Sequence, residues 1–276
     1  MNIVIITAVF AASLALILGI ALGVFRKVFH VETDVLVGLI RETLPGANCG
    51  ACGFPGCDGF ASAVASRTAP PDKCTVSSAD ETKKRGSLLG VDASSVPKVA
   101  FLICQGSVDC AQPKGVYTGT QSCRGAKISA GGTKLCSWGC LGFGDCVNVC
   151  PFGAISIGAN GLPQIDNSLC TGCGKCSTEC PQLVLKQIPR EQKGAIALCA
   201  NRSTIKPSVR KACAVGCIKC ESCIKKCPAE ALKLEGGVPA IDYGKCTSCG
   251  ICLTSCPSKV FTILGEIAKT ADTPAA

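Results

Sequence analysis

The sequence predicts an α+β protein in which one transmembrane helix is followed by several small cysteine-rich modules. Residues 2–25 contain no charged side chain, and 25 of the 276 residues are cysteine. Four stretches between Cys136 and Pro257 place a proline directly after the last of several spaced cysteines. With only nine Phe, two Tyr, one Trp and one Met, the chain has few large side chains for a single core. We therefore expect metal or disulfides to stabilise its modules.

The four cysteine runs favour iron–sulfur clusters. Their sequences are CSWGCLGFGDCVNVCP (136–151), CTGCGKCSTECP (170–181), CIKCESCIKKCP (217–228) and CTSCGICLTSCP (246–257). The last three follow C-x2-C-x2-C-x3-C-P, the run of bacterial two-cluster ferredoxins. Structural zinc sites pair two C-x2-C halves and need neither the additional cysteines nor the proline. A disulfide framework is disfavoured because the number of cysteines is odd and their spacing is that of chelating ligands. Clusters also require reducing surroundings.

The formal net charge of +9 does not indicate a nucleic-acid partner. The longest block of basic residues is 83–85, and no aromatic residues are interleaved with basic ones, so the pattern of a nucleic-acid surface is missing. An oxidised four-iron cluster with its four thiolates carries about −2. Five such clusters would make the loaded protein nearly neutral.

The N-terminal residues 1–27 predict a single-pass anchor in the cell (inner) membrane. As a helix, residues 2–25 would be about 36 Å long, enough to cross a hydrocarbon core of about 30 Å. Arg26 and Lys27 follow directly, so the positive-inside rule predicts that the rest of the chain is cytoplasmic. A cleaved signal peptide is disfavoured by the long apolar run and by the missing charged segment before it.

Residues 31–76 predict a small domain with one 4Fe–4S cluster. A short amphipathic helix is expected over 32–44, with Thr33 or Asp34 as its cap, and a second helix is expected from Asp58 or Gly59. Glycines between the cysteines let the backbone wrap closely around a cluster; they are Gly50, Gly53 and Gly56. The expected ligands are Cys49, Cys52, Cys57 and Cys74.

The rest of the chain contains an internal repeat. The Ser- and charge-rich residues 77–96 predict a linker, followed by modules at 97–190 and 191–264 and a flexible tail at 265–276. The segment Lys134-x-Cys136-x2-Gly139-Cys140 matches Lys211-x-Cys213-x2-Gly216-Cys217 in step. Strands are expected at Lys98–Cys104 and Ile196–Cys199, and after each Cys-Pro pair, at Ala154–Ile157, Leu183–Leu185, Ala231–Leu234 and Val260–Ile263.

In two-cluster ferredoxins the fourth cysteine of each run binds the other cluster. This rule predicts two ligand sets in the first module: Cys136, Cys140, Cys146 with Cys180, and Cys170, Cys173, Cys176 with Cys150. In the second module it predicts Cys217, Cys220, Cys223 with Cys256, and Cys246, Cys249, Cys252 with Cys227. Because Phe143 stands where the second module has Cys220, Cys136 is expected to supply the missing ligand. Five clusters result.

Five cysteines are left over: Cys104, Cys110, Cys123, Cys199 and Cys213. The repeat favours a sixth cluster that bridges the modules, held by Cys104, Cys123, Cys199 and Cys213, with Cys110 free. The alternative is that these cysteines are small buried hydrophobic residues.

The arrangement resembles the B subunit of the Rnf complex, a membrane-bound ion-translocating ferredoxin:NAD+ oxidoreductase, in its long form with two ferredoxin-like modules. The anchor, CGACGFPGC at 49–57 with Cys74, and CLGFGDCVNVCPFGAI at 140–155 carry the resemblance. It implies that ferredoxin donates electrons to the exposed modules. The clusters would pass them toward the membrane, to other Rnf-type membrane and flavin-bearing subunits.

Nothing in the sequence indicates a further catalytic site, so the chain is expected to act as one subunit of a translocase. It has no P-loop, no Rossmann glycine motif after a strand, no H-E-x-x-H, and a single histidine. Two other functions compete with this interpretation. One is a membrane-tethered polyferredoxin that serves a different redox enzyme, and the other is an anchored metal-storage protein.

Overall fold

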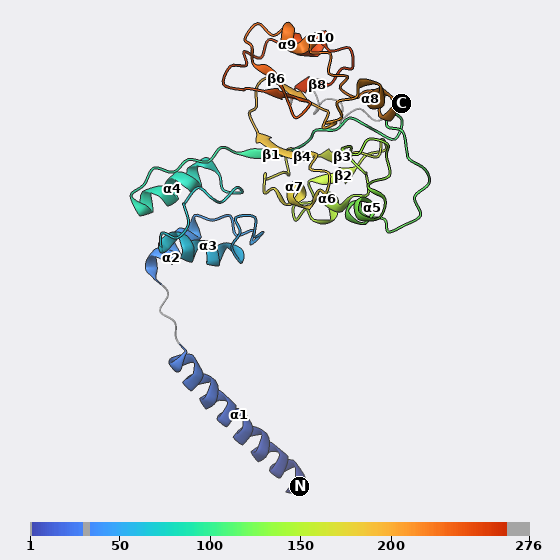
Figure 1. Ribbon diagram of the computed structural model, residues 1–276. Coiled ribbons are helices and arrows are strands. Elements are labelled where there is room, and N and C mark those ends of the chain that lie inside the picture. Colours follow the sequence, from blue (N-terminus) through green and yellow to red (C-terminus); the bar gives the residue numbers. More distant parts are fainter. Residues whose placement is uncertain (1, 30–33, 264–276) are drawn as a thin grey trace.

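The computed structural model describes residues 2–29 and 34–263. Helix α1 (Asn2–Val28) stands apart from a small helical domain and two α+β modules (Figure 1). Its segment Ile5–Phe25 has a mean hydropathy of 2.6 and none of it is buried. By length and composition, α1 is therefore able to cross a membrane. The expected tail at 265–276 and the alternative cap Thr33 lie outside the described residues.

The small domain is built from α2 (Val35–Glu42), α3 (Gly56–Ala65) and α4 (Ala79–Leu89). Asp34 caps α2, since its carboxylate accepts a hydrogen bond from the Leu36 N–H at 2.9 Å. On this helix Ile40 is buried, whereas Val35 and Leu39 are exposed. Helix α3 begins at Gly56, slightly earlier than the sequence predicts.

Helix α4 replaces most of the expected linker at 77–96. Ser78 and Glu81 form a capping box at its start, each bonding to the backbone N–H of the other. On its inner face Arg85 is fully buried, and its guanidinium donates to Ser77 Oγ at 2.6 Å and to the Thr43 carbonyl at 3.2 Å. Helix α4 is rich in charged residues because its outer face is exposed to solvent. The buried hydrogen bonds of Arg85 attach the helix to the N-terminal domain.

Each module has four short strands in two antiparallel pairs; the sequence predicts the first, second and fourth strand of each module and misses the third. In the first module β1 (Lys98–Leu102) pairs with β4 (Leu185–Pro189), and β2 (Ile155–Ile157) pairs with β3 (Pro163–Ile165). In the second, β5 (Ala195–Ala197) pairs with β8 (Phe261–Ile263), and β6 (Leu232–Glu235) pairs with β7 (Val238–Ile241). The first and last strands of a module therefore lie together, which closes the unit on itself.

Short helices carry the third cysteine of each run. These helices are α6 (Asp145–Asn148), α7 (Lys175–Glu179), α9 (Ser222–Lys225) and α10 (Ile251–Ser255). A left-handed residue precedes each of them: Gly144, Gly174, Glu221 and Gly250, with φ of 83°, 82°, 60° and 75°. One further helix precedes the first cysteine run of each module: α5 (Cys123–Ala130) in the first module and α8 (Lys206–Ala212) in the second.

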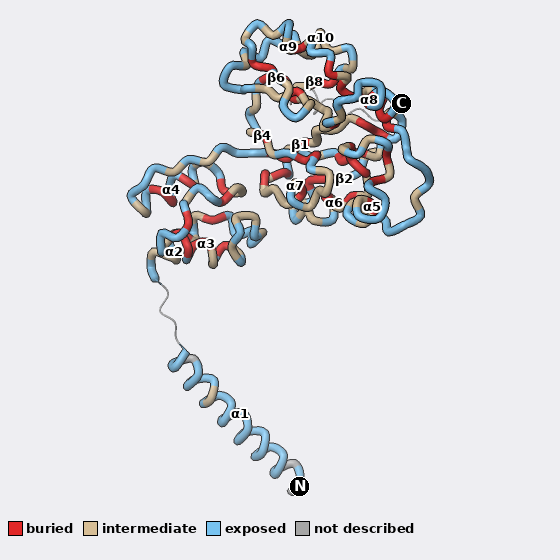
Figure 2. Tube along the Cα trace, viewed as in Figure 1, coloured by how far each residue is buried: buried red, intermediate tan, exposed pale blue. Residues whose placement is uncertain are grey.

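The interior of each module combines strand residues with cysteines. In the first module Val99, Phe101 and Leu185 are buried against Cys146 and Cys176. Buried residues lie along the strands and on one side of helices such as α3, whereas α1 is exposed along almost its whole length (Figure 2). Cysteines thus occupy positions that large apolar side chains fill in an ordinary core of this size.

Candidate iron–sulfur sites

The N-terminal domain gathers Cys49, Cys52, Cys57 and Cys74 around one pocket. Three glycines between them adopt positive φ: Gly50 at 69°, Gly53 at 86° and Gly56 at 81°. A side chain at any of these positions would be strained, so they allow the tight turns around the pocket that the sequence predicts. The Asn48 side chain accepts a hydrogen bond from the Cys57 N–H at 2.8 Å and fixes the start of α3. We call this set the N-terminal site.

The first module brings Cys150, Cys170, Cys173 and Cys176 together, and we call this set the Cys173 site. Burial raises the pKa of the Cys173 thiol, and the neighbouring thiols of Cys49, Cys150 and Cys170 raise it further. The Ala100 N–H on β1 donates to the Cys170 sulfur at 3.3 Å. Because Cys49 belongs to the N-terminal domain, that domain's cluster site is close enough to this site to influence it electrostatically.

The second set in the first module differs from the expected one. Its pocket is lined by Cys123, Cys140, Cys146 and Cys180, and we call it the Cys140 site. Cys123, expected in the bridging site, thus stands where Cys136 was expected. The position without a ligand holds Phe143, whose ring packs on Tyr117 with 5.7 Å between centroids.

Two polar contacts explain why Cys123 reaches this pocket. The Asp145 carboxylate accepts hydrogen bonds from the backbone N–H groups of Cys123 and Arg124, both at 3.0 Å. Arg124 also forms an ion pair with Glu179 at 3.0 Å. Asp145 precedes Cys146 and Glu179 precedes Cys180, so both contacts hold the start of α5 beside the other ligands.

Between the modules, a pocket is lined by Cys104 and Cys136 from the first and by Cys199 and Cys213 from the second. We call it the inter-module site. Cys136 is turned toward the second module, where the Asn201 amide donates to its sulfur at 3.5 Å. Cys110 does not line the pocket, and its carbonyl accepts a hydrogen bond from Ala214 N–H at 2.9 Å.

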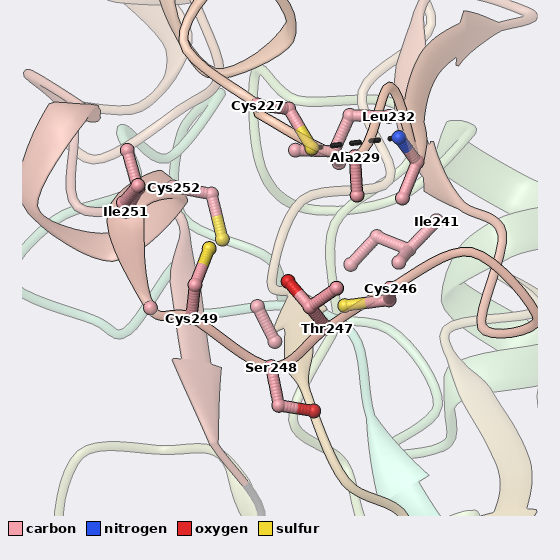
Figure 3. A pocket seen from close by; sticks show the side chains of 13 residues that line it. Cys227, Ala229, Leu232, Ile241, Cys246, Thr247, Ser248, Cys249, Ile251 and Cys252 are labelled. Carbon is pink, nitrogen blue, oxygen red and sulfur yellow. Dashed lines mark hydrogen bonds between the residues drawn. The ribbon is translucent and has the colours of Figure 1, made fainter.

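The second module forms two sets that match the sequence grouping. Cys217, Cys220, Cys223 and Cys256 line one pocket, and Cys227, Cys246, Cys249 and Cys252 line the other. We call them the Cys220 site and the Cys249 site. Figure 3 shows Cys227, Cys246, Cys249 and Cys252 around the Cys249 site, where the Ala231 N–H donates to the Cys227 sulfur at 3.4 Å. Cys220 and Cys249 are exposed, whereas the other cysteines of the chain are buried or half-buried.

These sites fit a group larger than one metal ion. All 25 cysteines are free thiols, and among the described residues no three ligand side chains converge on a single-ion position. The pockets of the N-terminal, Cys140, inter-module, Cys220 and Cys249 sites instead have volumes of about 330 to 400 Å³ with their mouths included. An ideal Cβ on Gly106 would lie 3.5 Å from the Cys213 sulfur and 3.6 Å from the Cys104 sulfur, so the backbone at Gly106 passes close to two thiols of the inter-module site. Four thiols around such a space suit a 4Fe–4S cluster.

Burial keeps thiols of the Cys140 site protonated when no metal is bound. Burial raises the pKa of Cys140 and of Cys146 to about 12. These side chains therefore stay protonated at neutral pH, and they give up their protons when iron replaces them.

The comparisons with known proteins agree with this chemistry. Residues 44–76 match the family model "Putative Fe-S cluster", and residues 136–184 and 216–260 match "4Fe-4S dicluster domain". The chain is 41% identical to the B subunit of the "Na(+)-translocating ferredoxin:NAD(+) oxidoreductase complex" of Acetobacterium woodii, over 84% of this chain and 69% of that protein. It is 40% identical to the B subunit of the "Proton-translocating ferredoxin:NAD(+) oxidoreductase complex" of Clostridium ljungdahlii, over 90% of this chain and 87% of the relative. The B subunit of the "Ion-translocating oxidoreductase complex" of Methanosarcina acetivorans is 37% identical over 86% of this chain and 89% of that protein. The chain belongs to the family of Rnf B subunits.

In this Rnf B subunit the matched ranges leave out Cys104, Cys123, Cys199 and Cys213. The repeat contained a sign that Cys136 belongs to the inter-module site, because Cys136 aligns with Cys213. In the structure these two cysteines line the same pocket. Sequence spacing alone favoured Cys136 for the Cys140 site because it is nearer along the chain. No sequence signal marked Asp145 as the residue that holds Cys123 in place.

Proposed function

We propose that this chain is the electron-transfer subunit of an ion-translocating ferredoxin:NAD+ oxidoreductase. It accepts electrons from reduced ferredoxin and passes them to membrane and flavin-bearing subunits. A 4Fe–4S cluster in each of the six four-cysteine sites would supply one-electron transfer. The residues of this chain hold the sites in a fixed order and connect them.

The observation that carries the proposal is the contact between cysteines of neighbouring sites. The Cys140 N–H donates to the Cys104 sulfur at 3.4 Å, and the Cys217 N–H donates to the Cys199 sulfur at 3.3 Å. The inter-module site is thereby connected to one site in each module. At the other end of the first module, burial raises the pKa of Cys146, and the Cys176 thiol lies close enough to raise it further.

The same reasoning gives the order of all six sites. Cys49 adjoins Cys173, and α9 and α10 pack together with Cys223 and Cys252 in them. The order is N-terminal, Cys173, Cys140, inter-module, Cys220 and Cys249 sites. It supports a single line of carriers rather than a store of metal.

The second module is the favoured entry point. Its Cys220 and Cys249 are exposed, and the helices beside them lie at the end of the molecule opposite α1 (Figure 1). Lys225, Lys226 and Lys245 are exposed close to these cysteines in sequence. Such a basic surface suits an acidic electron-carrier protein, because opposite charges steer encounter.

The other end of the line meets the membrane. Helix α1 anchors the chain, and the N-terminal site is the first site after it. Arg26 and Lys27 at the end of the apolar segment favour a cytoplasmic location for all six sites. Electrons that enter at the second module would leave from the N-terminal site toward partner subunits.

Freeze-quench EPR on the full chain, purified anaerobically in detergent and mixed with reduced ferredoxin, tests this function. In the wild type, signals from both modules and from the N-terminal site should appear. In Cys199→Ala the second-module signals should still appear, while those of the first module and the N-terminal site are delayed at least tenfold. Equal rates at all sites in Cys199→Ala, or no reduction of the wild type, would contradict the proposal.

A further inference from the structure

Lys134 is a buried basic residue beside the inter-module site. Its side chain lines the same pocket as Cys104, Cys136 and Cys213 and is only 7% exposed. Its ammonium donates one hydrogen bond, to the Gly106 carbonyl at 2.7 Å. A buried ammonium with a single neutral acceptor is poorly compensated by its protein neighbours, so negative charge in the pocket would balance it.

The position of Lys134 is not imposed by the repeat. Its counterpart in the second module, Lys211, is exposed. The difference comes from the connection between Cys104 and α5, which is longer than that between Cys199 and α8. Two backbone hydrogen bonds join this connection to the residues on either side of Lys134. The Leu135 N–H donates to the Gln112 carbonyl at 2.8 Å, and the Lys114 N–H donates to the Thr133 carbonyl at 2.8 Å. The inserted segment thus covers Lys134 and supplies its acceptor.

Hydrogen-bond donors to sulfur are also concentrated at this site. Three N–H groups donate to its sulfurs, those of Cys140, Cys217 and the Asn201 side chain. At three other sites Ala100, Ala231 and Val260 donate one such bond each, to the sulfurs of Cys170, Cys227 and Cys256. Donors to the sulfurs and a nearby cation both favour the more negative state of a cluster, which is the reduced state.

We propose that Lys134 is a potential-setting residue. Its buried ammonium, together with the Asn201 amide, raises the reduction potential of the cluster held by Cys104, Cys136, Cys199 and Cys213. The inference rests on the proposed cluster at that site. The step concerned adds one electron to the cluster, and no bond of the chain forms or breaks. An electron is thereby stabilised at the junction between the modules, midway along the line of sites.

A structural role is the competing explanation, in which Lys134 only holds the inserted segment through Gly106. A redox titration followed by EPR distinguishes the two, using the full chain with its clusters. The signal of the inter-module cluster is identified as the one lost in Cys199→Ala. Lys134→Met should lower the midpoint potential of that signal, and Lys134→Arg should restore it. Lys211→Met is the matched control, because it removes the repeat-related but exposed charge, and it should leave the potential unchanged.

Iron content separates the outcomes. An unchanged midpoint potential in Lys134→Met with wild-type iron overturns the inference and leaves the proposed function intact. An iron content that Cys199→Ala does not lower overturns the proposed cluster itself. If the Lys134→Met variant fails to assemble the cluster, the Asn201→Asp variant tests the inference instead. This substitution keeps the acceptor for the Ser203 N–H and removes the amide donor to the Cys136 sulfur. It should lower the potential of the same signal, and an unchanged potential there overturns the inference.

Discussion

The Cys140 N–H donates to the Cys104 sulfur at 3.4 Å, although these two cysteines line different pockets. The second module repeats the relationship between Cys217 and Cys199 at 3.3 Å. In each module, one of the two sulfurs at the junction therefore accepts a hydrogen bond from the neighbouring site in the same way. This local symmetry makes the inter-module site a product of the duplication, and it depends on both copies of the repeat.

The first prediction concerns Cys123. Because Cys123 completes the Cys140 site in place of Phe143, Cys123→Ala should alter the EPR signal of that cluster. It should also lower the iron content by about one to four atoms per chain. Cys110→Ala is the matched control, since Cys110 lines none of the five pockets. Iron loss in Cys110→Ala, or none in Cys123→Ala, would contradict the assignment.

The second prediction concerns Asp145, which holds the first turn of α5. Asp145→Ala removes the acceptor for the N–H groups of Cys123 and Arg124. The loss of such a cap costs about 1 kcal/mol of unfolding free energy. The EPR signal affected should be the one that changes in Cys123→Ala. Asp109→Ala, at an exposed carboxylate in the same module, should change neither unfolding nor EPR. A normal spectrum for Asp145→Ala would show that Cys123 is positioned by other contacts.

The third prediction concerns Arg85 in α4. Arg85→Met leaves Ser77 and the Thr43 carbonyl without their buried partner, and the expected loss in unfolding free energy is about 3 kcal/mol. Lys84→Met, on the exposed side of the same helix, should stay within about 0.5 kcal/mol. Denaturant unfolding of the full chain, followed by the loss of cluster absorbance, measures both. Equal stability of the two variants would mean that α4 is not part of the domain.

The fourth prediction concerns the basic surface of the second module. Lys225→Glu with Lys226→Glu should slow reduction by ferredoxin about tenfold at low salt, and the difference should shrink as salt rises. The double variant Lys83→Glu and Lys84→Glu carries the same charge change on α4, far along the chain from Cys220. Stopped-flow absorbance gives both rates. If the two double variants are slowed equally, net charge rather than a docking surface controls the rate.

Much of this fold was predictable because metal-ligand spacing is a strong local signal. The strands after each Cys-Pro pair, the glycine turns of the N-terminal domain and the apolar helix all follow from short stretches of sequence. Each depends on neighbouring residues, such as Gly53 beside Cys52. The grouping around Cys249 likewise follows from the general rule that the fourth cysteine crosses to the other cluster.

The features that sequence missed depend on contacts between distant residues. Helix α4 looked like a linker because its charged residues dominate the composition, and the burial of Arg85 depends on Thr43 and Pro71. The expected positions of Cys123 and Cys136 are interchanged because Asp145 holds Cys123 at the Cys140 site and Asn201 contacts Cys136 at the inter-module site. Asn201 lies outside the four cysteine runs, and although Asp145 lies within the run 136–151, nothing there marks it as the partner of a residue 22 positions earlier.

Iron and acid-labile sulfide per chain test the central claim most directly, which is that a sixth cluster joins the two modules. The wild-type chain should bind about 24 irons with an equal amount of sulfide, and Cys104→Ala combined with Cys199→Ala should bind about 20. The EPR signals of the remaining five clusters should persist in that variant. A wild-type content of about 20, unchanged in the double variant, would contradict the account.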